Sequence, residues 1–352
     1  VFPHRYRDAA PHIRAQTLAD LGAWMVAYPQ GYLEDGHLKY LGWSLSDPRP
    51  EVRRAALGAL RPLYEDPELV GHLEAFTARF GPRLRDMTRD VDAQTALQAL
   101  ALCRVLLSRG LLDSCDDEEL DAVDALAFDP ALGAEARAEA LAFVLEHLAA
   151  FDPEHRGRDR PLRLAAQLEA VVELCDYHLG PEGDPALCDL LVEAARRLPQ
   201  KEVLEHWKSY FTLLLDQKKP IGDRKASLLL RIMQCAIQST AKEGNLSEPA
   251  AKKPKKSKKQ SAEDADSIES LTVELLKHLP SLLVRFSADT DKIEQLVKLA
   301  AYLDPQIISV DRYAASFSNL LTQLKKIFLA SSEDEILGPC VATLSRLAGA
   351  AG

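Results

Sequence analysis

The residue types that could carry out catalysis or hold a metal are scattered along this chain. Its six cysteines, at positions 103, 115, 175, 188, 235 and 340, form no CxxC pair, and nearby histidines complete no zinc pattern. The sequence contains no glycine-rich phosphate loop, GxSxG motif or HExxH motif. The acidic run Asp116–Glu119 lacks the glycine turn of a calcium loop and is typical of a helix start. We therefore expect no enzyme, no metal site, no cofactor and no small-molecule substrate.

A tryptophan on the polar side of a helix indicates binding chemistry instead. In the expected helix Leu33–Leu45, the residues Asp35, Lys39 and Trp43 are spaced i, i+4 and i+8 and share one face. This spacing makes an ion pair between Asp35 and Lys39 possible. The spacing leaves two roles open for Trp43, because a tryptophan there can cover the next repeat or anchor a bound partner.

A second helical stripe is apolar and ends in a phenylalanine whose neighbour in the sequence is an arginine. The stripe consists of Leu69, Leu73, Phe76 and Phe80. Its spacing predicts that Phe80 is a core residue, whereas Arg79 lies off the stripe and is expected to be a solvated charge. We expect Gly81 and Pro82 to end this helix.

A lysine tract is the third candidate. Its cations are Lys252, Lys253, Lys255, Lys256, Lys258 and Lys259. Such a run is typical of a nuclear localisation signal or a nucleic-acid contact, and a solubilising loop is the alternative. The net charge of the chain is −10, so any DNA contact must use local basic patches.

The elements that position these residues are predicted to be helices. The chain has 352 residues, of which 47% are hydrophobic and only 6% aromatic, and the abundant Ala, Leu, Glu and Arg favour helices. No apolar run approaches the ~20 residues of a membrane span. Scattered cysteines favour a reducing compartment. The chain starts at Val1 rather than Met, as expected of a piece of a longer protein.

Two segments of the chain superimpose with a shift of 39 residues. The first register is Asp8, Pro11, Ile13, Arg14, Leu18 and Leu21, and the second is Asp47, Pro50, Val52, Arg53, Leu57 and Leu60. The aspartate is expected to cap a helix, the proline fits the first turn, and the arginine can reach back to a carboxylate of a neighbouring repeat. A weaker form of the pattern recurs at Asp90–Val105 and from Asp129 onward.

This repeat predicts an all-α fold, a HEAT-like α-solenoid of stacked antiparallel helix pairs. Beyond residue 150 the strict pattern fades, but helical spacing continues. The expected helices there are Leu162–Leu179, Leu187–Leu198, Glu202–Leu215, Arg224–Thr240, Ile268–Phe286, Asp291–Leu303, Asp311–Leu329 and Asp334–Ala348. Residues 241–266 are low in complexity and are expected to form a disordered lysine-rich loop.

Several short runs, in order, resemble the stromalin conserved domain, which belongs to the stromal-antigen HEAT-repeat subunits of cohesin. The runs are Val1–Phe2, His4–Asp8, Ile13–Arg14, Trp24–Met25, Leu38–Trp43 and Phe76–Phe80. Weaker similarity at Trp207–Lys208, Leu213–Asp216 and Pro280–Phe286 looks most like the plant and green-algal branch. The sequence departs from the family at Pro3 and across residues 108–200.

The resemblance implies a non-catalytic scaffold in the nucleus and on chromosomes that supports sister chromatid cohesion and chromosome segregation. Its implied partners are the kleisin subunit of cohesin, DNA, and regulators with Phe-x-Phe type peptides. In the family such peptides bind a surface groove, whose matching positions here are Tyr6, Arg7, Asp35, Lys39, Trp43, Arg79 and Phe80. This favours the anchor role for Trp43 and contests the core prediction for Phe80.

The resemblance also divides the chain. Residues 1–85 are expected to form the stromalin conserved domain, 86–240 further HEAT-like repeats, 241–266 a basic linker and 267–352 further HEAT-like helices. The alternative is a HEAT adaptor of the importin or phosphatase type without a chromatin role, which an acidic face binding basic cargo peptides would favour.

Overall fold

In a computed structural model, the chain is described at residues 2–112, 117–150, 159–179, 184, 186–244 and 258–350. Within these ranges, every regular element is a helix, in agreement with the predicted all-α class. The chain divides into two compact units, Val1–Asp152 and Pro153–Gly352. We call them unit 1 and unit 2 and describe each by itself.

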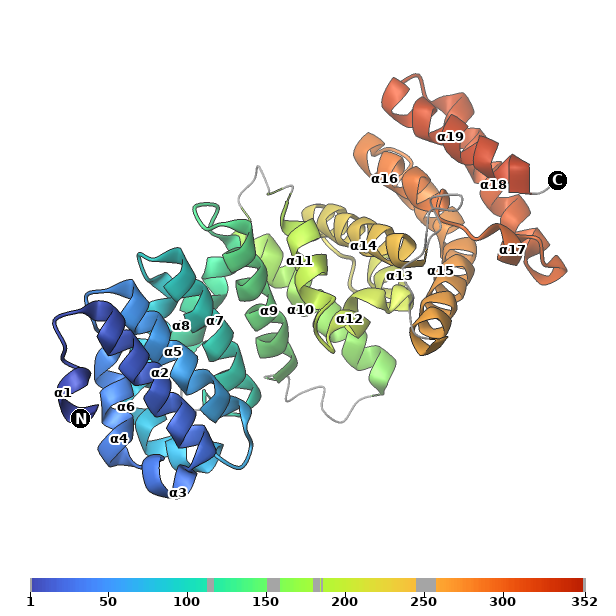
Figure 1. Cartoon of the computed structure of the whole chain (residues 1–352). Helices are drawn as coiled ribbons and strands as arrows, with labels where there is room; N and C mark the ends of the chain where they lie inside the picture. The colour runs from blue at the N-terminus through green and yellow to red at the C-terminus, as the bar shows by residue number, and fades with distance from the viewer. Residues whose placement is uncertain are drawn as a thin grey trace. The chain divides into compact units, whose positions relative to one another are not determined.

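Unit 1 is built from two layers of helices (Figure 1). The elements are α1 (Phe2–Arg5), α2 (Pro11–Ala27), α3 (Pro29–Tyr32), α4 (Asp35–Ser44), α5 (Pro50–Glu65), α6 (Glu74–Asp86), α7 (Ala93–Ser108), α8 (Asp117–Asp124) and α9 (Ala134–Ala150). Helices α2, α5, α7 and α9 pack in succession as one layer, and α4 and α6 pack on each other and against that layer. This is the expected stacking of antiparallel helix pairs.

Arginine–aspartate pairs join successive repeats of unit 1. Arg14 donates from Nε and Nη2 to the Asp47 carboxylate, both at 2.8 Å. One repeat later, Arg53 donates to Asp90 at 2.8 and 2.6 Å. The predicted link between an arginine and a carboxylate of a neighbouring repeat is therefore confirmed, but its predicted direction is wrong, because each arginine reaches forward to the following repeat. Such parallel double hydrogen bonds fix direction as well as distance.

Three local predictions for unit 1 need correction. Asp8 and Asp47 are not helix caps, because each Oδ1 accepts the amide two residues later, while the N-cap of α2 is Ala10. Helix α6 continues through Pro82 to Asp86. The proline removes the amide that would bond the carbonyl of Ala78, which is exposed and can bond water instead. The expected helix Leu33–Leu45 begins at Asp35.

Unit 2 contains longer and less regular helices. They are α10 (Arg160–His178), α11 (Leu187–Ala195), α12 (Lys201–Glu205), α13 (Trp207–Leu215), α14 (Asp223–Gly244), α15 (Lys258–Arg285), α16 (Thr290–Ala300), α17 (Pro305–Ile308), α18 (Ala314–Ala330) and α19 (Asp334–Ala350). The helices expected from periodicity are present, except that Glu202–Leu215 is split at His206. A short 3₁₀ turn, Asp311–Tyr313, precedes α18.

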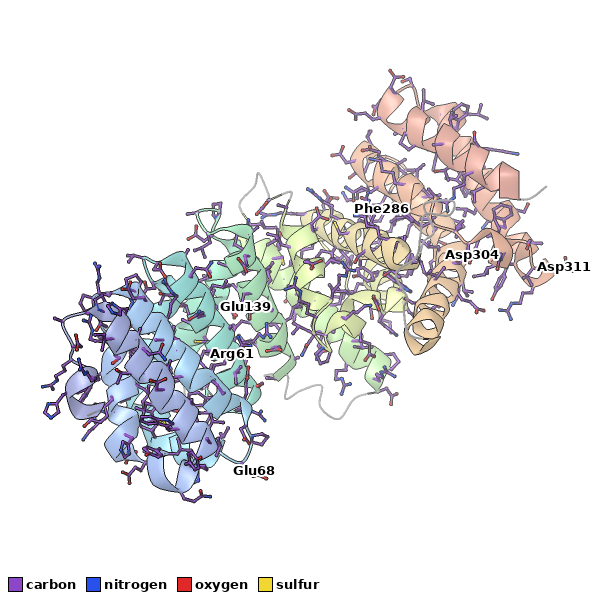
Figure 2. All side chains as sticks on the ribbon, viewed as in Figure 1. Arg61, Glu68, Glu139, Phe286, Asp304 and Asp311 are labelled. Carbon is purple, nitrogen blue, oxygen red and sulfur yellow. The ribbon has the colours of Figure 1, made fainter. Side chains whose placement is uncertain are left out.

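Two large side chains with polar groups, Trp207 and Lys292, are fully buried in unit 2 and form hydrogen bonds there. Trp207 is 1% exposed, and its Nε1 donates to the carbonyl of Ser267 at 3.2 Å. Lys292 is also 1% exposed; its Nζ donates to Asp223 at 2.6 Å and to Asp289. The same ammonium lies 5.7 Å from the ring centroid of Phe286, which is labelled in Figure 2. Burial disfavours the ammonium charge, but the two carboxylates outweigh it and raise the pKa of Lys292.

The loop predicted over residues 241–266 is too long at both ends, because residues 241–244 belong to α14 and residues 258–266 belong to α15. Helix α14 runs through Gly244 and α15 begins at Lys258. Four of the predicted contact lysines lie outside the described residues, namely Lys252, Lys253, Lys255 and Lys256. Lys258 and Lys259 form the first residues of α15. The role of the tract stays a prediction.

Candidate peptide-binding surface

The turn between α1 and α2 carries two of the predicted site residues, Tyr6 and Arg7. Asp8 holds this turn, because its carboxylate accepts the Ala10 amide at 3.0 Å and the Arg5 guanidinium at 2.7 Å. These two hydrogen bonds, the one from Ala10 first, lower the pKa of Asp8 below its ordinary value. These contacts of Asp8 with Arg5 and Ala10 thus fix the position of Tyr6 relative to α1 and α2.

Three aromatic rings meet where this turn reaches α4, and we call them the aromatic cluster: Tyr6, Tyr40 and Trp43. The centroids of Tyr6 and Tyr40 are 4.6 Å apart, and those of Tyr6 and Trp43 are 6.3 Å apart. Trp43 meets Tyr40 edge-on at 5.7 Å. Aromatic rings at these distances attract one another beyond their burial. Trp43 remains 43% exposed, so much of its ring is open to solvent.

Two cations stand over the cluster. The Lys39 ammonium lies 5.2 Å from the Tyr40 centroid and 5.8 Å from the Trp43 centroid. The Arg7 guanidinium lies 5.0 Å from the Tyr6 centroid. The possible Asp35–Lys39 ion pair does not form: among the described residues, no ion pair or hydrogen bond joins these two side chains. The ring faces offer Lys39 an alternative to the exposed Asp35 carboxylate.

Phe80 and Arg79, on α6, form a second part of the surface, which we call the Phe80 edge. Phe80 is half-buried and its ring lies 4.8 Å from that of buried Phe76. The Arg79 guanidinium is exposed and lies 5.2 Å from the Phe80 centroid. The core prediction for Phe80 is thus partly met, because the ring packs on Phe76 while the residue is only half-buried, and its role in a peptide groove stays a prediction.

The structure brings together most, but not all, of the predicted site residues. Tyr6, Arg7, Lys39 and Trp43 are in direct contact through the aromatic cluster, whereas Asp35 stands apart at the start of α4. Sequence reasoning missed Tyr40, although it lies within the recognised run Leu38–Trp43. Tyr40 lies off the Asp35–Lys39–Trp43 stripe, so helical spacing did not single it out. It joins the surface because the α1–α2 turn places Tyr6 against it.

No metal-binding or membrane-spanning element is evident in the described ranges. Among those residues, no group of three or more His, Cys, Asp or Glu side chains could hold a metal ion. Within the same part of the chain, no helix has the length and apolar character needed to cross a bilayer.

Two family models match the chain. The stromalin conservative domain matches residues 7–81, which include both the aromatic cluster and the Phe80 edge except for Tyr6. The model described as "Cohesin subunit SCC3/SA, HEAT-repeats domain" matches residues 196–351. Together the two matches cover parts of both units.

Relatives in plants and animals resemble the chain along nearly its whole length. Sister-chromatid cohesion protein 3 of Arabidopsis thaliana is 30% identical over 98% of this chain and 31% of its own length. Cohesin subunit SA-3 of Rattus norvegicus is 31% identical over 96% of this chain and 27% of its own length. The chain therefore spans about a third of these relatives. Because the two identities are nearly equal, assignment to the plant and green-algal branch stays a prediction.

Solved structures show the same fold. Cohesin subunit Scc3 from Z. rouxii superimposes with a TM-score of 0.66 at 17% identity, over 100% of this chain and 41% of that one. Kap121p bound to Nup53p superimposes with a TM-score of 0.51 at 12% identity, over 99% and 37%. The second likeness is one of solenoid architecture alone. On the family matches and the relatives, the chain belongs to the stromalin, or Scc3/SA, family of HEAT-repeat proteins.

Proposed function

We propose that this chain is part of a non-catalytic scaffold subunit of cohesin, and that its aromatic cluster holds a peptide of a partner protein. The observation that carries the proposal is the exposure of Trp43 within an ordered cluster. Trp43 contacts Tyr6 and Tyr40 and still exposes 43% of its surface. An exposed tryptophan whose ring is already held in place is typical of binding hot spots.

The chemistry of the surface suits a peptide with two aromatic side chains, of the Phe-x-Phe type. One ring can pack on the exposed part of Trp43, and a second can pack at the Phe80 edge. The Lys39 and Arg79 cations can then donate hydrogen bonds to carbonyl oxygens of the peptide backbone. Rings and cations arranged in this way favour aromatic residues over aliphatic ones.

The wider role follows from the family. Relatives carry names that refer to cohesin and to sister-chromatid cohesion. We accordingly propose a place on chromosomes in the nucleus, with kleisin, DNA and cohesin regulators as partners. Support comes from the family matches in both units and from the repeat architecture, which offers long surfaces for protein partners.

The peptide proposal is tested with the 352-residue chain and a fluorescein-labelled Phe-x-Phe peptide. We expect Trp43→Ala to weaken binding by about 30-fold, as for loss of a hot spot. Arg79→Glu should weaken it less, because that side chain is at the rim. Trp24→Ala is the matched control, since Trp24 is 41% exposed but packs on Tyr32, outside the cluster.

Fluorescence polarisation measures the affinities, and an Ala-x-Ala peptide reports non-specific binding. Equal losses in the Trp43 and Trp24 variants, or no loss in either, would contradict the assignment of the surface. Circular dichroism of each variant should remain unchanged, because both tryptophans are exposed.

A further inference from the structure

Gly42 lies between the two parts of the proposed binding surface. At about 100° per residue along α4, Gly42 is about 60° from Lys39 and about 100° from Trp43. On its other side are the buried residues Leu38 and Leu41. Gly42 itself is buried, so it stands at the border between the core face of α4 and the face that binds.

The ring of Phe80 occupies the space that a side chain at position 42 would need. A Cβ atom built on Gly42 would lie 2.4, 2.5 and 2.7 Å from three ring atoms of Phe80. Real Cβ contacts essentially never come below 3.0 Å, so an alanine there would force either the ring or a helix to move. The absence of a side chain thus allows the ring of one repeat to pack directly on the helix backbone of the repeat before it.

The Phe80 ring has little freedom to move aside. Phe76, one turn earlier on α6, is 3% exposed and packs on the ring at 4.8 Å. One turn after Arg79 on α6, the Arg83 side chain donates to the carbonyl of Leu45 at the end of α4, at 3.0 and 3.3 Å. Helices α4 and α6 are therefore joined at two points, by the Phe80 ring on Gly42 and by Arg83 on Leu45.

We infer that Gly42 is a positioning residue that sets the separation between Trp43 on α4 and Arg79 on α6. The inference rests on the proposed function, because the separation matters only to a ligand that contacts both helices. A peptide with two aromatic residues at fixed spacing is such a ligand. Close packing of Phe80 on Gly42 fixes the distance between the places where the two aromatic side chains of the peptide bind. Gly42 therefore determines which spacing of aromatic residues in a peptide fits the surface.

The test is a double-mutant cycle on Gly42→Ala and Phe80→Leu in the 352-residue chain. Gly42→Ala should weaken the labelled Phe-x-Phe peptide by about tenfold, as expected for a site whose two halves shift by about an ångström. Leucine at position 80 removes the ring atoms that conflict with the new Cβ. In the Phe80→Leu background, Gly42→Ala should therefore cause little further loss.

Gly22→Ala is the matched control for simple destabilisation. A Cβ at Gly22 would meet the Cβ of Ala59 at 2.5 Å, which is a comparable conflict between α2 and α5. We expect this variant to lower the melting temperature and to leave peptide affinity unchanged. A peptide with two intervening residues, Phe-x-x-Phe, completes the set, and Gly42→Ala should penalise it less than Phe-x-Phe.

Each outcome bears on one claim. If Gly42→Ala weakens the peptide equally with Phe or Leu at position 80, or weakens both peptides equally, the positioning role is wrong. If the Gly42 and Phe80 variants couple in melting temperature but Trp43→Ala leaves the peptide unaffected, the packing stands and the proposed function fails. If affinity is unchanged in Gly42→Ala while Trp43→Ala abolishes binding, the function stands and the inference is overturned.

Discussion

In unit 1, Arg53 reaches the next repeat with two hydrogen bonds to one buried carboxylate, whereas in unit 2 a single lysine lies between two more exposed ones. The Arg53 and Asp90 side chains are 8% and 5% exposed. The carboxylates around Lys292 are 85% exposed at Asp223 and 34% at Asp289. Planar guanidinium groups fix the angle between two repeats, while an ammonium ion tolerates several arrangements. The two units thus use polar links of different rigidity.

Within unit 1 itself, a change of linking residues coincides with the point where the 39-residue repeat becomes weaker in the sequence. The Asp-to-Arg spacing of six residues occurs at Asp8 and again at Asp47, but at Asp90 the corresponding residue is Ala96. Ala96 is buried and cannot reach the next carboxylate, and α7 and α9 are joined instead by Arg104 and Glu139, 2.7 Å apart. Figure 2 labels Glu139 on α9. The Arg104–Glu139 pair thus links successive repeats in place of an arginine–aspartate pair, and the 39-residue spacing of Asp and Arg no longer appears in the sequence.

The largest effect is expected from Arg53→Ala. It leaves the buried Asp90 carboxylate without its partner, so unfolding of unit 1 should become easier by about 3–5 kcal/mol. Denaturant unfolding followed by hydrogen exchange in α5 and α7 measures the change. Arg61→Ala is the control, since the Arg61–Glu65 pair is half exposed and its loss should cost about 0–1 kcal/mol. Similar losses in both variants would mean that the interrepeat pair is not a rigid link.

A smaller effect is expected from Gly22→Ala, which tests close helix packing in unit 1. The new Cβ conflicts with Ala59, and overpacking of this kind costs about 1–3 kcal/mol. Gly58→Ala is the control, because a Cβ there meets nothing within 4 Å and alanine favours helices. The melting temperature should fall for the first variant and rise or hold for the second. In unit 2, Gly338→Ala should behave like Gly58→Ala, since its Cβ also meets nothing within 4 Å.

Lys292→Met in unit 2 is the counterpart of Arg53→Ala in unit 1 and tests how much the buried lysine contributes to stability. The thioether fills much of the space of the lysine stem, and the two carboxylates can take up water because both are partly exposed. The expected loss is therefore only about 1–2 kcal/mol. Lys298→Met should cost less than about 0.5 kcal/mol, because its pair with Glu294 is partly exposed and is therefore weakened by solvent. A loss for Lys292→Met as large as that for Arg53→Ala would remove the contrast between the two units.

The smallest expected effect is on the stability of unit 1 at low pH. The Thr95 hydroxyl and amide donate to the Asp92 carboxylate at the start of α7, and together with Arg54 they lower the pKa of Asp92. A lowered folded pKa means that this contribution is present above the ordinary value of 3.8 and is lost as pH falls through the lowered pKa. Asp92→Asn should reduce the acid loss of stability below pH 4 by about 1 kcal/mol or less. Melting curves from pH 2 to 7 measure it, and an unchanged acid limb would refute the assignment.

Local patterns in the sequence predicted the fold well because they depend on neighbours in the chain. The helices of unit 1, the proline in the first turn of α2 and the arginine link to Asp47 all follow from spacing. Two features did not follow from these patterns. The segment Glu202–Leu215 contains no Gly or Pro that would mark the split at His206. Helix α6 continues through Pro82, although proline ordinarily ends or kinks a helix.

The surface that we propose for peptide binding was only partly predictable from the sequence. Motif resemblance supplied Tyr6 and Trp43, but the ring contact between Tyr40 and Tyr6 depends on how the α1–α2 turn folds back. The packing of Phe80 on Gly42 joins residues 38 positions apart, and no periodicity within one helix encodes it. Lys39 lies over the rings of Tyr40 and Trp43 on its own helix instead of pairing with Asp35, and the i, i+4 spacing allowed either contact without deciding between them.

The three tryptophans give this chain built-in optical labels of two kinds. Trp207 is enclosed in unit 2, so its emission should be blue and shielded from acrylamide. Trp43 and Trp24 face water, so their emission should be red and readily quenched. A partner that covers Trp43 would move one of these signals toward the blue while Trp207 stays constant. The native protein can thus report occupancy of its own surface, with an internal standard, before any dye is attached.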